Sequence, residues 1–331
     1  MKILVAPLNW GLGHASRCVP LIQRFLDEGH EVILGGDGES LTLLRRHFPG
    51  LRYVYLAPLQ LRYGRGKSQV WAMIKALPRL LRWAIQDHTM LQAVLREEHI
   101  DRVISDNRFG LYSRNTDCTY LTHQLHIRLP EGWRWAEPIA AKMHARIYTR
   151  YNKVWVPDYE EQEKSLSGEL GHPQKSFVHR TSSLCTLSYI GPLSRFQNNP
   201  INQNNLNSPS YSTVAVLSGL EPHRTLLESE ITARYQNSAE QVLIVQGLLH
   251  RPNTRIKRGN LTIVPSMGDK ELASALLGAK HIIVRSGYST IMDLEALGLL
   301  NLQPPVIEFI PTPGQPEQEY LAFWVQKRTS E

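Results

Sequence analysis

The feature that most constrains this chain is an alternation of short apolar runs with longer helical patterns, which fills the first half and then starts again. In the first half the short runs, rich in β-branched and aromatic residues, are residues 3–6, 31–34, 53–57, 102–105, 119–122 and 153–156. Strands that alternate with helices form a parallel sheet, because a crossover helix carries the chain back to the starting edge. The first half is therefore predicted to be an α/β domain.

A second series of strands follows a stretch that lacks the composition of a core. Residues 196–212 are dominated by Asn, Ser, Pro and Gln, which predicts a linker or a flexible excursion. Strand patterns resume at residues 213–217, 242–245, 261–264, 281–284 and 306–309, with helical patterns at 223–235, 269–277 and 290–299. We therefore predict two Rossmann-like, doubly wound domains, 1–195 and 213–331, which face each other across a cleft at the carboxyl ends of both sheets.

Composition narrows the class of protein and its partners. The 331 residues are 42% hydrophobic and carry a formal net charge of +7, which favours an anionic partner such as a nucleotide, a phospholipid headgroup or a nucleic acid. Cys18, Cys118 and Cys185 lack the spacing of a disulfide framework or a zinc site, so reduced thiols of a cytoplasmic protein are expected. No run approaches the roughly 18 apolar residues that span a bilayer.

A glycine-containing loop follows the first strand pattern and opens a helical one. It contains Gly11, Gly13 and His14, and glycines at such a turn let the backbone approach a ligand near the positive end of a helix. His14 is a candidate general base for an acceptor hydroxyl, with a plain surface histidine as the alternative. The fingerprint of dinucleotide-binding proteins is incomplete, because Ser16 stands where its third glycine belongs. A tight turn that binds no ligand is therefore the alternative interpretation of this loop.

Two of the later predicted strands are each followed by a polar side chain. Asp106 follows residues 102–105, and His123 follows residues 119–122. The carboxyl ends of parallel strands meet at one edge of a sheet, so both residues are expected near His14. Asp106 is predicted to orient or charge-stabilise that histidine, with a helix N-cap as the alternative. His123 is predicted to lie on the acceptor side, with a satisfied buried polar group as the alternative.

Three segments of the second half carry groups that suit a nucleotide sugar. Turn amides and hydroxyls favour phosphate, arginine adds charge, an aspartate accepts the hydroxyls of a ribose, and later Gln and Glu side chains suit a sugar. In chain order these candidate donor-binding residues are Ser218, Gly219 and Arg224, then Arg285, Ser286, Gly287, Ser289, Thr290 and Asp293, and finally Gln315, Glu317 and Gln318.

These segments, together with Gly13 and His14, resemble the GT-B nucleotide-sugar glycosyltransferases, in particular the bacterial N-acetylglucosaminyltransferase of peptidoglycan synthesis and its relatives. The resemblance implies that Asp293 binds the donor ribose, that Glu317 and Gln318 bind the sugar, and that His14 lies beside the acceptor as the base. Asp293 stands where the family more commonly has Glu, and the first loop lacks the Gly-Gly pair of the peptidoglycan enzyme. The chain ends about where the family's closing helix begins, which implies a short helix or a curtailed C-terminus.

A basic and aromatic stretch precedes the fourth strand pattern. Its cations, with no acidic residue before Asp87, alternate with apolar residues that include Trp71 and Trp83; the cations are Arg62, Arg65, Lys67, Lys75, Arg79 and Arg82. Such a pattern is typical of helices at anionic membrane surfaces, and a core-packed helix with a solvated basic face is the alternative. No nucleic-acid module accompanies it, so no nucleic-acid partner is expected.

The sequence thus predicts an inverting glycosyltransferase that needs neither metal nor cofactor and moves a sugar from a UDP-sugar to an acceptor hydroxyl. The acceptor favoured by the basic stretch is lipid-linked, at the inner face of the cytoplasmic membrane. Backbone amides, a helix dipole and Arg224 or Arg285 are expected to stabilise the leaving diphosphate. The alternatives are a nucleotide-sugar 2-epimerase or hydrolase of the same fold, a non-catalytic nucleotide-binding module and, more remotely, a dinucleotide oxidoreductase.

Overall fold

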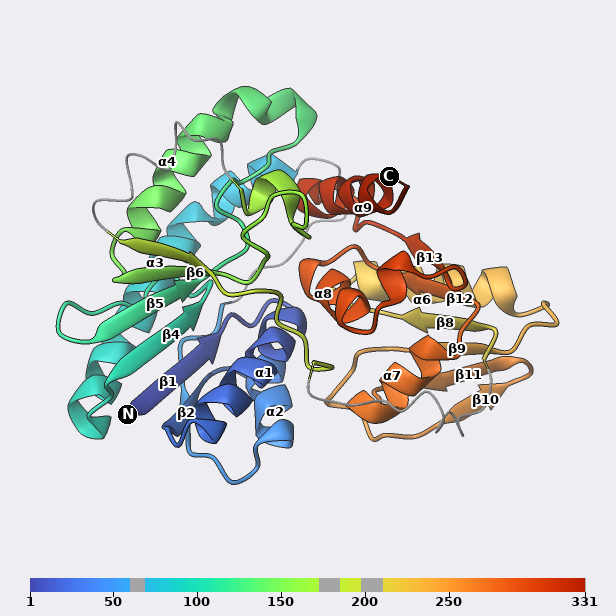
Figure 1. Ribbon diagram of the computed structural model, residues 1–331, viewed down its shortest axis with the longest axis horizontal. Helices are drawn as coiled ribbons and strands as arrows, with labels where there is room; N and C mark the ends of the chain where they lie inside the picture. Colours follow the sequence, from blue (N-terminus) through green and yellow to red (C-terminus); the bar gives the residue numbers. More distant parts are fainter. Residues whose placement is uncertain (60–68, 173–184, 198–210, 331) are drawn as a thin grey trace.

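The computed structural model describes residues 1–59, 69–172, 185–197 and 211–330, of which 69–75 and 330 are described at the level of the backbone. Within these ranges the chain forms two α/β units, each built on one sheet (Figure 1). Residues 198–210, most of the expected linker, lie outside the described residues. The residues that flank this gap, Phe196 and Tyr211, are buried.

The first sheet is parallel throughout and has the strand order β3-β2-β1-β4-β5-β6-β7. Its strands are β1 (Lys2–Pro7), β2 (Glu31–Gly36), β3 (Tyr53–Tyr55), β4 (Arg102–Asp106), β5 (Asp117–Leu121), β6 (Lys153–Val156) and β7 (Thr186–Tyr189). Both faces are covered, because alternate residues of β1 are buried in different clusters. Ile3 and Val5 pack with α1 (Gly13–Asp27) and α2 (Gly38–His47), whereas Leu4 and Ala6 pack with α3 (Gln69–Glu98) and α4 (Glu137–Tyr148).

The second sheet has the order β10-β11-β9-β8-β12-β13 and is parallel except for the β10–β11 pair. Its strands are β8 (Thr213–Val216), β9 (Val242–Val245), β10 (Ile256–Arg258), β11 (Leu261–Val264), β12 (His281–Val284) and β13 (Val306–Phe309). Helix α6 (His223–Tyr235) covers one face, and α7 (Asp269–Leu277) and α8 (Tyr288–Ala296) cover the other. The predicted doubly wound architecture is confirmed for both units.

The sequence patterns placed most of these elements and missed a few. The predicted helix at residues 290–299 in fact starts at Tyr288 and ends at Ala296, because Gly298 adopts a left-handed φ of 70° that stops it. Strand β7 was missed, and so was β10, whose three residues are all exposed and therefore carry no apolar pattern. Helix α4 and three short 3₁₀ turns of the described residues also had no place in the predicted series; the turns are η1 (Glu131–Ala136), η2 (Gly168–Leu170) and η4 (Leu299–Asn301).

One apolar cluster joins the two units. It runs from the α1 and α2 side of the first sheet, through Leu193 and Phe196, to the α7 and α8 side of the second sheet. At its centre Ser289 donates a hydrogen bond to the backbone carbonyl of Gly13 over 2.8 Å, and a Cβ atom at Gly13 would lie only 2.9 Å from the Ser289 hydroxyl. Glycine at position 13 therefore lets α8 reach the first loop.

Helix α9 (Pro316–Ser330) follows the second sheet but packs against the first unit, and lies above both sheets in Figure 1. The indole of Trp324 donates to the backbone carbonyl of Ser165 over 2.9 Å, and the Tyr320 hydroxyl accepts from the backbone of Glu169 over 2.8 Å. This helix occupies the place that the resemblance gave to a closing helix. None of the described helices combines the length and the apolarity that crossing a bilayer demands.

Part of the basic stretch belongs to α3, which is described from Gln69 onward. Arg62, Arg65 and Lys67 lie outside the described residues, and the side chains of Trp71 and Lys75 are not described either. Trp83 is buried, and its indole donates to the backbone carbonyl of Ala57 over 2.9 Å. The core-packed alternative is therefore the correct one for this tryptophan.

Charged pairs also bridge the two units around the apolar cluster. His47 at the end of α2 contacts Asp269 at the start of α7, with 2.8 Å between Nε2 and Oδ2. The hydrogen bond that His47 donates to Asp269 raises the pKa of His47, although partial burial acts against it, and the same pair lowers the pKa of Asp269. Arg195 also faces Asp269, at 3.3 Å.

We predict that the His47–Asp269 pair stabilises the protein in a pH-dependent way. A raised folded pKa means that the contribution is complete below the ordinary histidine value of about 6.5 and is lost as the pH rises through the higher folded value. His47→Gln should therefore lower the free energy of unfolding by up to about 1 kcal/mol near pH 6 and by less near pH 8.5. Thermal unfolding at both pH values measures this, and an equal loss at both would contradict it.

Candidate active site

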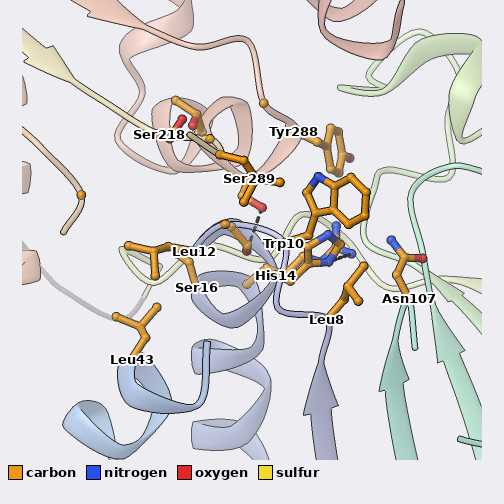
Figure 2. A pocket seen from close by; sticks show the side chains of 18 of the residues that line it. Leu8, Trp10, Leu12, His14, Ser16, Leu43, Asn107, Ser218, Tyr288 and Ser289 are labelled. Atoms are coloured by element: carbon orange, nitrogen blue, oxygen red, sulfur yellow. Dashed lines mark hydrogen bonds between the residues drawn. The ribbon is translucent and has the colours of Figure 1, made fainter. Parts of the chain in front are cut away.

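A cavity of about 950 Å³ lies between the two units and is lined by both. The first unit contributes the loop after β1 and the residues after β4 and β5, and the second contributes the turns after β8, β9 and β12 and the start of α9. Figure 2 shows Trp10 and His14 of the first loop facing Ser289 and Tyr288 at the start of α8. The two parallel sheets thus meet at their carboxyl ends, where α/β folds bind ligands.

The first loop presents His14 to this cavity. Gly11 has a φ of 73°, which lets the loop turn tightly before α1 begins at Gly13. The Nδ1 atom of His14 lies 2.9 Å from Oδ1 of Asp106, and its Nε2 atom makes no hydrogen bond to the described residues. The predicted partnership of His14 and Asp106 is therefore present in the geometry.

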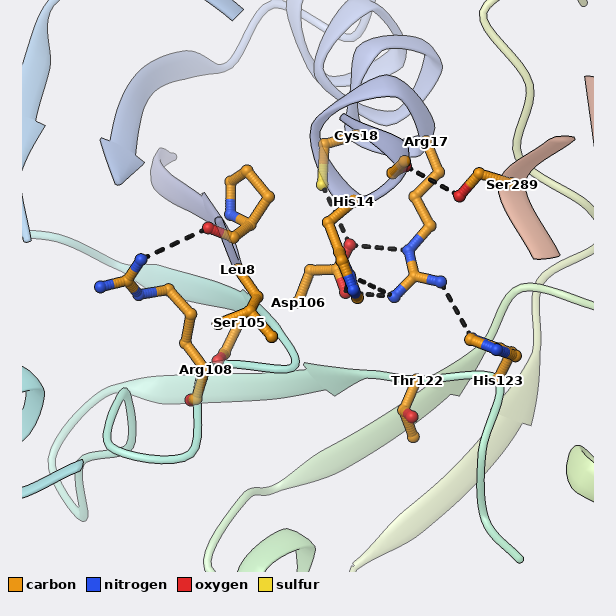
Figure 3. A network of polar contacts seen from close by, with 12 residues as sticks. Leu8, His14, Arg17, Cys18, Ser105, Asp106, Arg108, Thr122, His123 and Ser289 are labelled. Atoms are coloured by element: carbon orange, nitrogen blue, oxygen red, sulfur yellow. Dashed lines mark hydrogen bonds and ion pairs between the residues drawn. The ribbon is translucent and has the colours of Figure 1, made fainter. Parts of the chain in front are cut away.

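Asp106 itself is fully buried beneath the cavity and does not line it. Arg17, one turn after His14 on α1, contacts both of its oxygens, with 2.7 Å between Nε and Oδ2, as Figure 3 shows. Burial alone would raise the pKa of Asp106, but the charges of Arg17 and His14 outweigh it and hold that pKa well below its usual range. Asp106 is therefore ionised and can accept a hydrogen bond from Nδ1 of His14, and Nη2 of Arg17 lies 3.0 Å from the same nitrogen.

His123 follows β5 and reaches the same site with both ring nitrogens occupied. Its Nδ1 atom lies 3.0 Å from Nη1 of Arg17, and its Nε2 atom lies 2.7 Å from Oε1 of Glu317 in α9. Tyr288 stacks on the ring at 4.2 Å between centroids. Burial lowers the pKa of His123, with Glu317 acting in the opposite direction. His123 has no free nitrogen for proton transfer, so the satisfied polar role fits it better than that of a base.

Most candidate donor residues meet in the second unit's part of the cavity. Those that line it are Ser218, Gly219, Gly287, Ser289, Thr290, Asp293, Gln315, Glu317 and Gln318. Gly219 has a φ of 96°, so this turn requires glycine. Helix α8 begins here with Gly287 as its N-cap, and within the described residues no side chain caps its amides. An uncapped helix start that lines a cavity suits an anion.

Asp293 lies in the cavity wall with partners on both oxygens. It accepts a hydrogen bond from Ser194 over 2.6 Å and faces Nε of Arg195 at 3.4 Å. Burial raises the pKa of Asp293, and Arg195 and Ser194 act against that rise. Arg195 also lines the cavity and is shared between Asp293 and Asp269. A guanidinium that is divided between two carboxylates remains able to bind an anionic ligand.

The two predicted sugar-binding residues have protein partners too. Glu317 accepts from His123, and the side-chain oxygen of Gln318 accepts from the backbone of Thr312 over 2.8 Å. The side-chain nitrogen of Gln318 makes no hydrogen bond to the described residues.

Three candidate donor residues lie away from the cavity. Arg224 donates to the neighbouring carboxylates of Glu221 and Glu228, and Arg285 donates to three backbone carbonyls. The hydroxyl of Ser286 donates to a backbone carbonyl of α9. None of the three is among the described residues that line the cavity. The placement of Arg224 and Arg285 therefore gives no support to their expected contact with a diphosphate, because their guanidinium groups hold the second unit together instead.

Arg17, Arg195 and Tyr288 are members of this site that were not predicted from the sequence. Arg17 was detectable in principle, because a residue three positions after His14 lies on the same face of the helix. Arg195 sits next to the predicted linker and outside every motif, so only the folded chain brings it to the cavity. Tyr288 stands inside a quoted turn, but its stacking partner is in the other unit.

The chain is similar to glycosyltransferases both in sequence and in fold. No protein-family model matches it. A protein of Methanosarcina mazei named an uncharacterized glycosyltransferase is 22% identical, over 99% of this chain and 84% of its own length. Among solved structures, the glycotransferase of kitacinnamycin has a TM-score of 0.58 at 14% identity, over 98% of this chain and 84% of that one. The spinosyn rhamnosyltransferase SpnG complexed with thymidine diphosphate has a TM-score of 0.54 at 13% identity, over 100% and 90%.

These comparisons confirm the fold predicted from the sequence, two Rossmann-like domains in the GT-B arrangement. The curated relatives are named glycosyltransferases, which is the class of enzyme predicted from the sequence. They do not bear on the peptidoglycan branch that the motifs resemble.

Proposed function

We propose that the chain transfers a sugar from a nucleoside diphosphate donor, held mainly by the second domain, to an acceptor hydroxyl that enters from the first. The observation that carries this proposal is the geometry of His14, whose Nδ1 atom is bonded to Asp106 at 2.9 Å while its ring lines the cavity opposite α8. UDP is the nucleotide we expect, with TDP as the second candidate because SpnG was solved with thymidine diphosphate.

The reaction follows from the two halves of the cavity. His14 takes the proton of the acceptor hydroxyl on Nε2, while the acceptor oxygen forms a bond to the anomeric carbon of the sugar. The bond between that carbon and the diphosphate oxygen breaks, and the diphosphate leaves with the bonding electrons. Attack from the face opposite the leaving group inverts the anomeric configuration. Asp106 stabilises the imidazolium that forms.

The leaving diphosphate is placed at the start of α8, beside Ser218 and Gly219. The amides of the first helical turn and the helix dipole offer partial positive charge there, so we propose transfer without a metal ion. Arg195 takes the role that was predicted for Arg224 or Arg285, because Arg195 lines the cavity and they do not. No cofactor enters this scheme.

Asp293 is proposed to bind the donor ribose, and Glu317 and Gln318 the sugar. Each lines the cavity, and each would share its side chain between the ligand and the partners described above. An epimerase or hydrolase would use the same donor groups, and it is distinguished by consuming a UDP-sugar without an acceptor. A binding module would take up the nucleotide and consume no sugar.

The acceptor is proposed to be apolar next to its hydroxyl. The first domain's side of the cavity is walled by Leu8, Trp10, Leu59, Leu80 and Phe109, which belong to one apolar cluster. Such walls bury aliphatic or aromatic surface, and a lipid-linked acceptor fits them.

An anionic membrane surface is the proposed partner of the first domain. Leu77, Leu81 and Ile85 form an exposed stripe on α3, and α4 with the turn before it carries a second stripe, Trp135, Ile139 and Met143. Both helices cover the same face of the first sheet. Exposed cations flank the stripes, namely Arg79, Arg82, Lys142 and Arg146. Apolar residues flanked by cations are typical of surfaces that lie on anionic bilayers, so we place the protein at the inner face of the cytoplasmic membrane.

Removal of the base tests the mechanism. His14→Ala should lower turnover by about 10²- to 10⁴-fold, because general-base catalysis is lost, while nucleotide affinity barely moves. Asp106→Asn should lower turnover in the same direction. Steady-state assays with UDP-sugars and TDP-sugars, run beside nucleotide titration, separate the two quantities. Near-normal turnover in His14→Ala would place the base elsewhere, and lost nucleotide binding would move His14 to the donor site.

The assignment of Asp293 to the donor ribose predicts a loss of nucleotide affinity when this residue of the second domain is changed. Asp293→Ala should weaken UDP binding by roughly 1.5 to 3 kcal/mol, the value of a hydrogen bond to a charged group. Isothermal titration measures the affinity, and circular dichroism shows whether the variant is folded. Ser194→Ala is the matched control, since it removes a partner of Asp293 and keeps the carboxylate. Unchanged affinity in a folded Asp293→Ala protein would refute the assignment.

The membrane proposal predicts salt-sensitive binding to anionic vesicles. Leu81→Ser combined with Ile139→Ser should reduce co-sedimentation with vesicles of phosphatidylglycerol, and high salt should reduce it further by screening the cations. Leu226→Ser, an exposed leucine on α6 of the second domain, is the control and should bind as the wild type does. Equal binding to neutral and anionic vesicles would count against an anionic surface.

A further inference from the structure

A continuous line of polar side chains crosses from the first domain to the second along the wall of the cavity. It starts at Asp106, passes through Arg17 and His123, and ends at Glu317 in α9. The three contacts measure 2.7 Å, 3.0 Å and 2.7 Å. Figure 3 shows the guanidinium of Arg17 lying between Asp106 and His123.

The proposed base requires the proton of His14 on Nδ1, because Nη2 of Arg17 also lies 3.0 Å from that nitrogen and would donate to it in the other tautomer. Arg17 donates only, so Nδ1 of His123 accepts from it and the remaining proton of His123 sits on Nε2, where it is donated to Glu317. At the other end, Asp106 accepts from Arg17 and from Nδ1 of His14. Arg17 is 1% exposed and His123 is 5% exposed, so the polar atoms of both side chains bond mainly to protein groups. A shift of any member therefore displaces its neighbours.

We propose that Arg17 is a positioning residue that makes the geometry of the base depend on the second domain. Glu317 fixes His123, His123 fixes the guanidinium of Arg17, and Arg17 sets the Asp106 carboxylate against His14. Since α9 belongs to the second domain by sequence and packs on the first, the base is correctly placed only when the two domains meet as they do here. This role rests on the proposed function for His14.

The position of Glu317 connects the donor half of the cavity to the base. Its carboxylate lines the donor half of the cavity, whereas His14 lies in the acceptor half. Because Glu317 orients His14 through this line, His14 is aligned only when the second domain lies against the first. Proton removal from the acceptor is therefore limited when the two domains are apart. A purely structural role for Arg17 would stabilise β4 and α1 without this dependence.

Histidine resonances provide the direct test. In protein with ¹⁵N-labelled histidine, wild type should show the proton of His14 on Nδ1 and that of His123 on Nε2. Glu317→Ala should shift the ring nitrogens of His14, although Glu317 makes no contact with His14 among the described hydrogen bonds. Glu319→Ala, an exposed acid on the same helix, is the control and should leave them unchanged. Unshifted His14 resonances in Glu317→Ala, or a proton on Nδ1 of His123, would overturn the proposal.

A kinetic arm separates positioning from stability. Arg17→Lys keeps the charge but cannot reach both Asp106 and His123, so turnover should fall by about 10- to 100-fold at saturating donor with UDP affinity unchanged. The double variant with His123→Phe, which breaks the same line but keeps the proposed sugar-binding Glu317, should lose no more turnover than the worse single variant. A turnover loss in the double variant equal to the product of the two single losses would contradict the positioning role. A lower melting temperature of Arg17→Lys with normal turnover would also contradict it. Absence of transfer by the wild type would refute the proposed function, while the resonance test would still decide the role of Arg17.

Discussion

Asp106 is a fully buried carboxylate at the carboxyl end of β4, and a buried charge without partners costs several kcal/mol. Arg17 is the partner that makes this burial tolerable, since its guanidinium reaches both carboxylate oxygens. The pair fixes α1 against β4 and leaves one oxygen of Asp106 within reach of His14. Removing Arg17 alone would leave the charge unpaired, at a cost of about 3 to 5 kcal/mol. The proposed chemistry of the first domain therefore depends on an ion pair whose carboxylate lies outside the lining of the cavity.

The two domains meet in a way that serves the same chemistry. Apolar side chains from both form one cluster, and Ser289 of α8 reaches the backbone of Gly13 next to His14. A helix start that suits a diphosphate is thus held against the loop that carries the base. Direct displacement at a sugar requires the base and the leaving group on opposite sides of the reacting carbon. Close contact between α1 and α8 limits how far apart these groups can move.

The architecture was predictable from the sequence because each strand carries its own local signal. Strands β9, β11 and β12 have the predicted bounds, since buried β-branched runs bounded by turn residues are distinctive, and β13 has them too, although its residues are exposed or half-buried. Partnership of His14 and Asp106 was predictable as well, because strand ends and the first loop converge in any doubly wound sheet. Strand β10 was not, because its exposed residues are held by pairing with β11 alone.

Contacts between distant segments were the part that the sequence did not reveal. Arg224 and Arg285 were predicted from the sequence to bind phosphate. In the fold, Arg224 donates hydrogen bonds to nearby carboxylates and Arg285 donates to backbone carbonyls. Glu317 was predicted from a motif to bind the sugar, and its bond to His123 depends on where α9 crosses between the domains. Arg195 precedes the predicted linker, which carries no recognisable motif, and only tertiary packing brings it to the cavity.

The central claim, that the second domain binds a nucleoside diphosphate against the start of α8, is tested most directly by thermal unfolding of the wild type with UDP, TDP, GDP or NAD. A ligand that binds the folded state stabilises it by mass action, by about 2.7 kcal/mol at a hundred times its Kd. The account predicts a higher melting temperature with UDP or TDP and no change with NAD. Stabilisation by NAD, with no response to any nucleoside diphosphate, would contradict it.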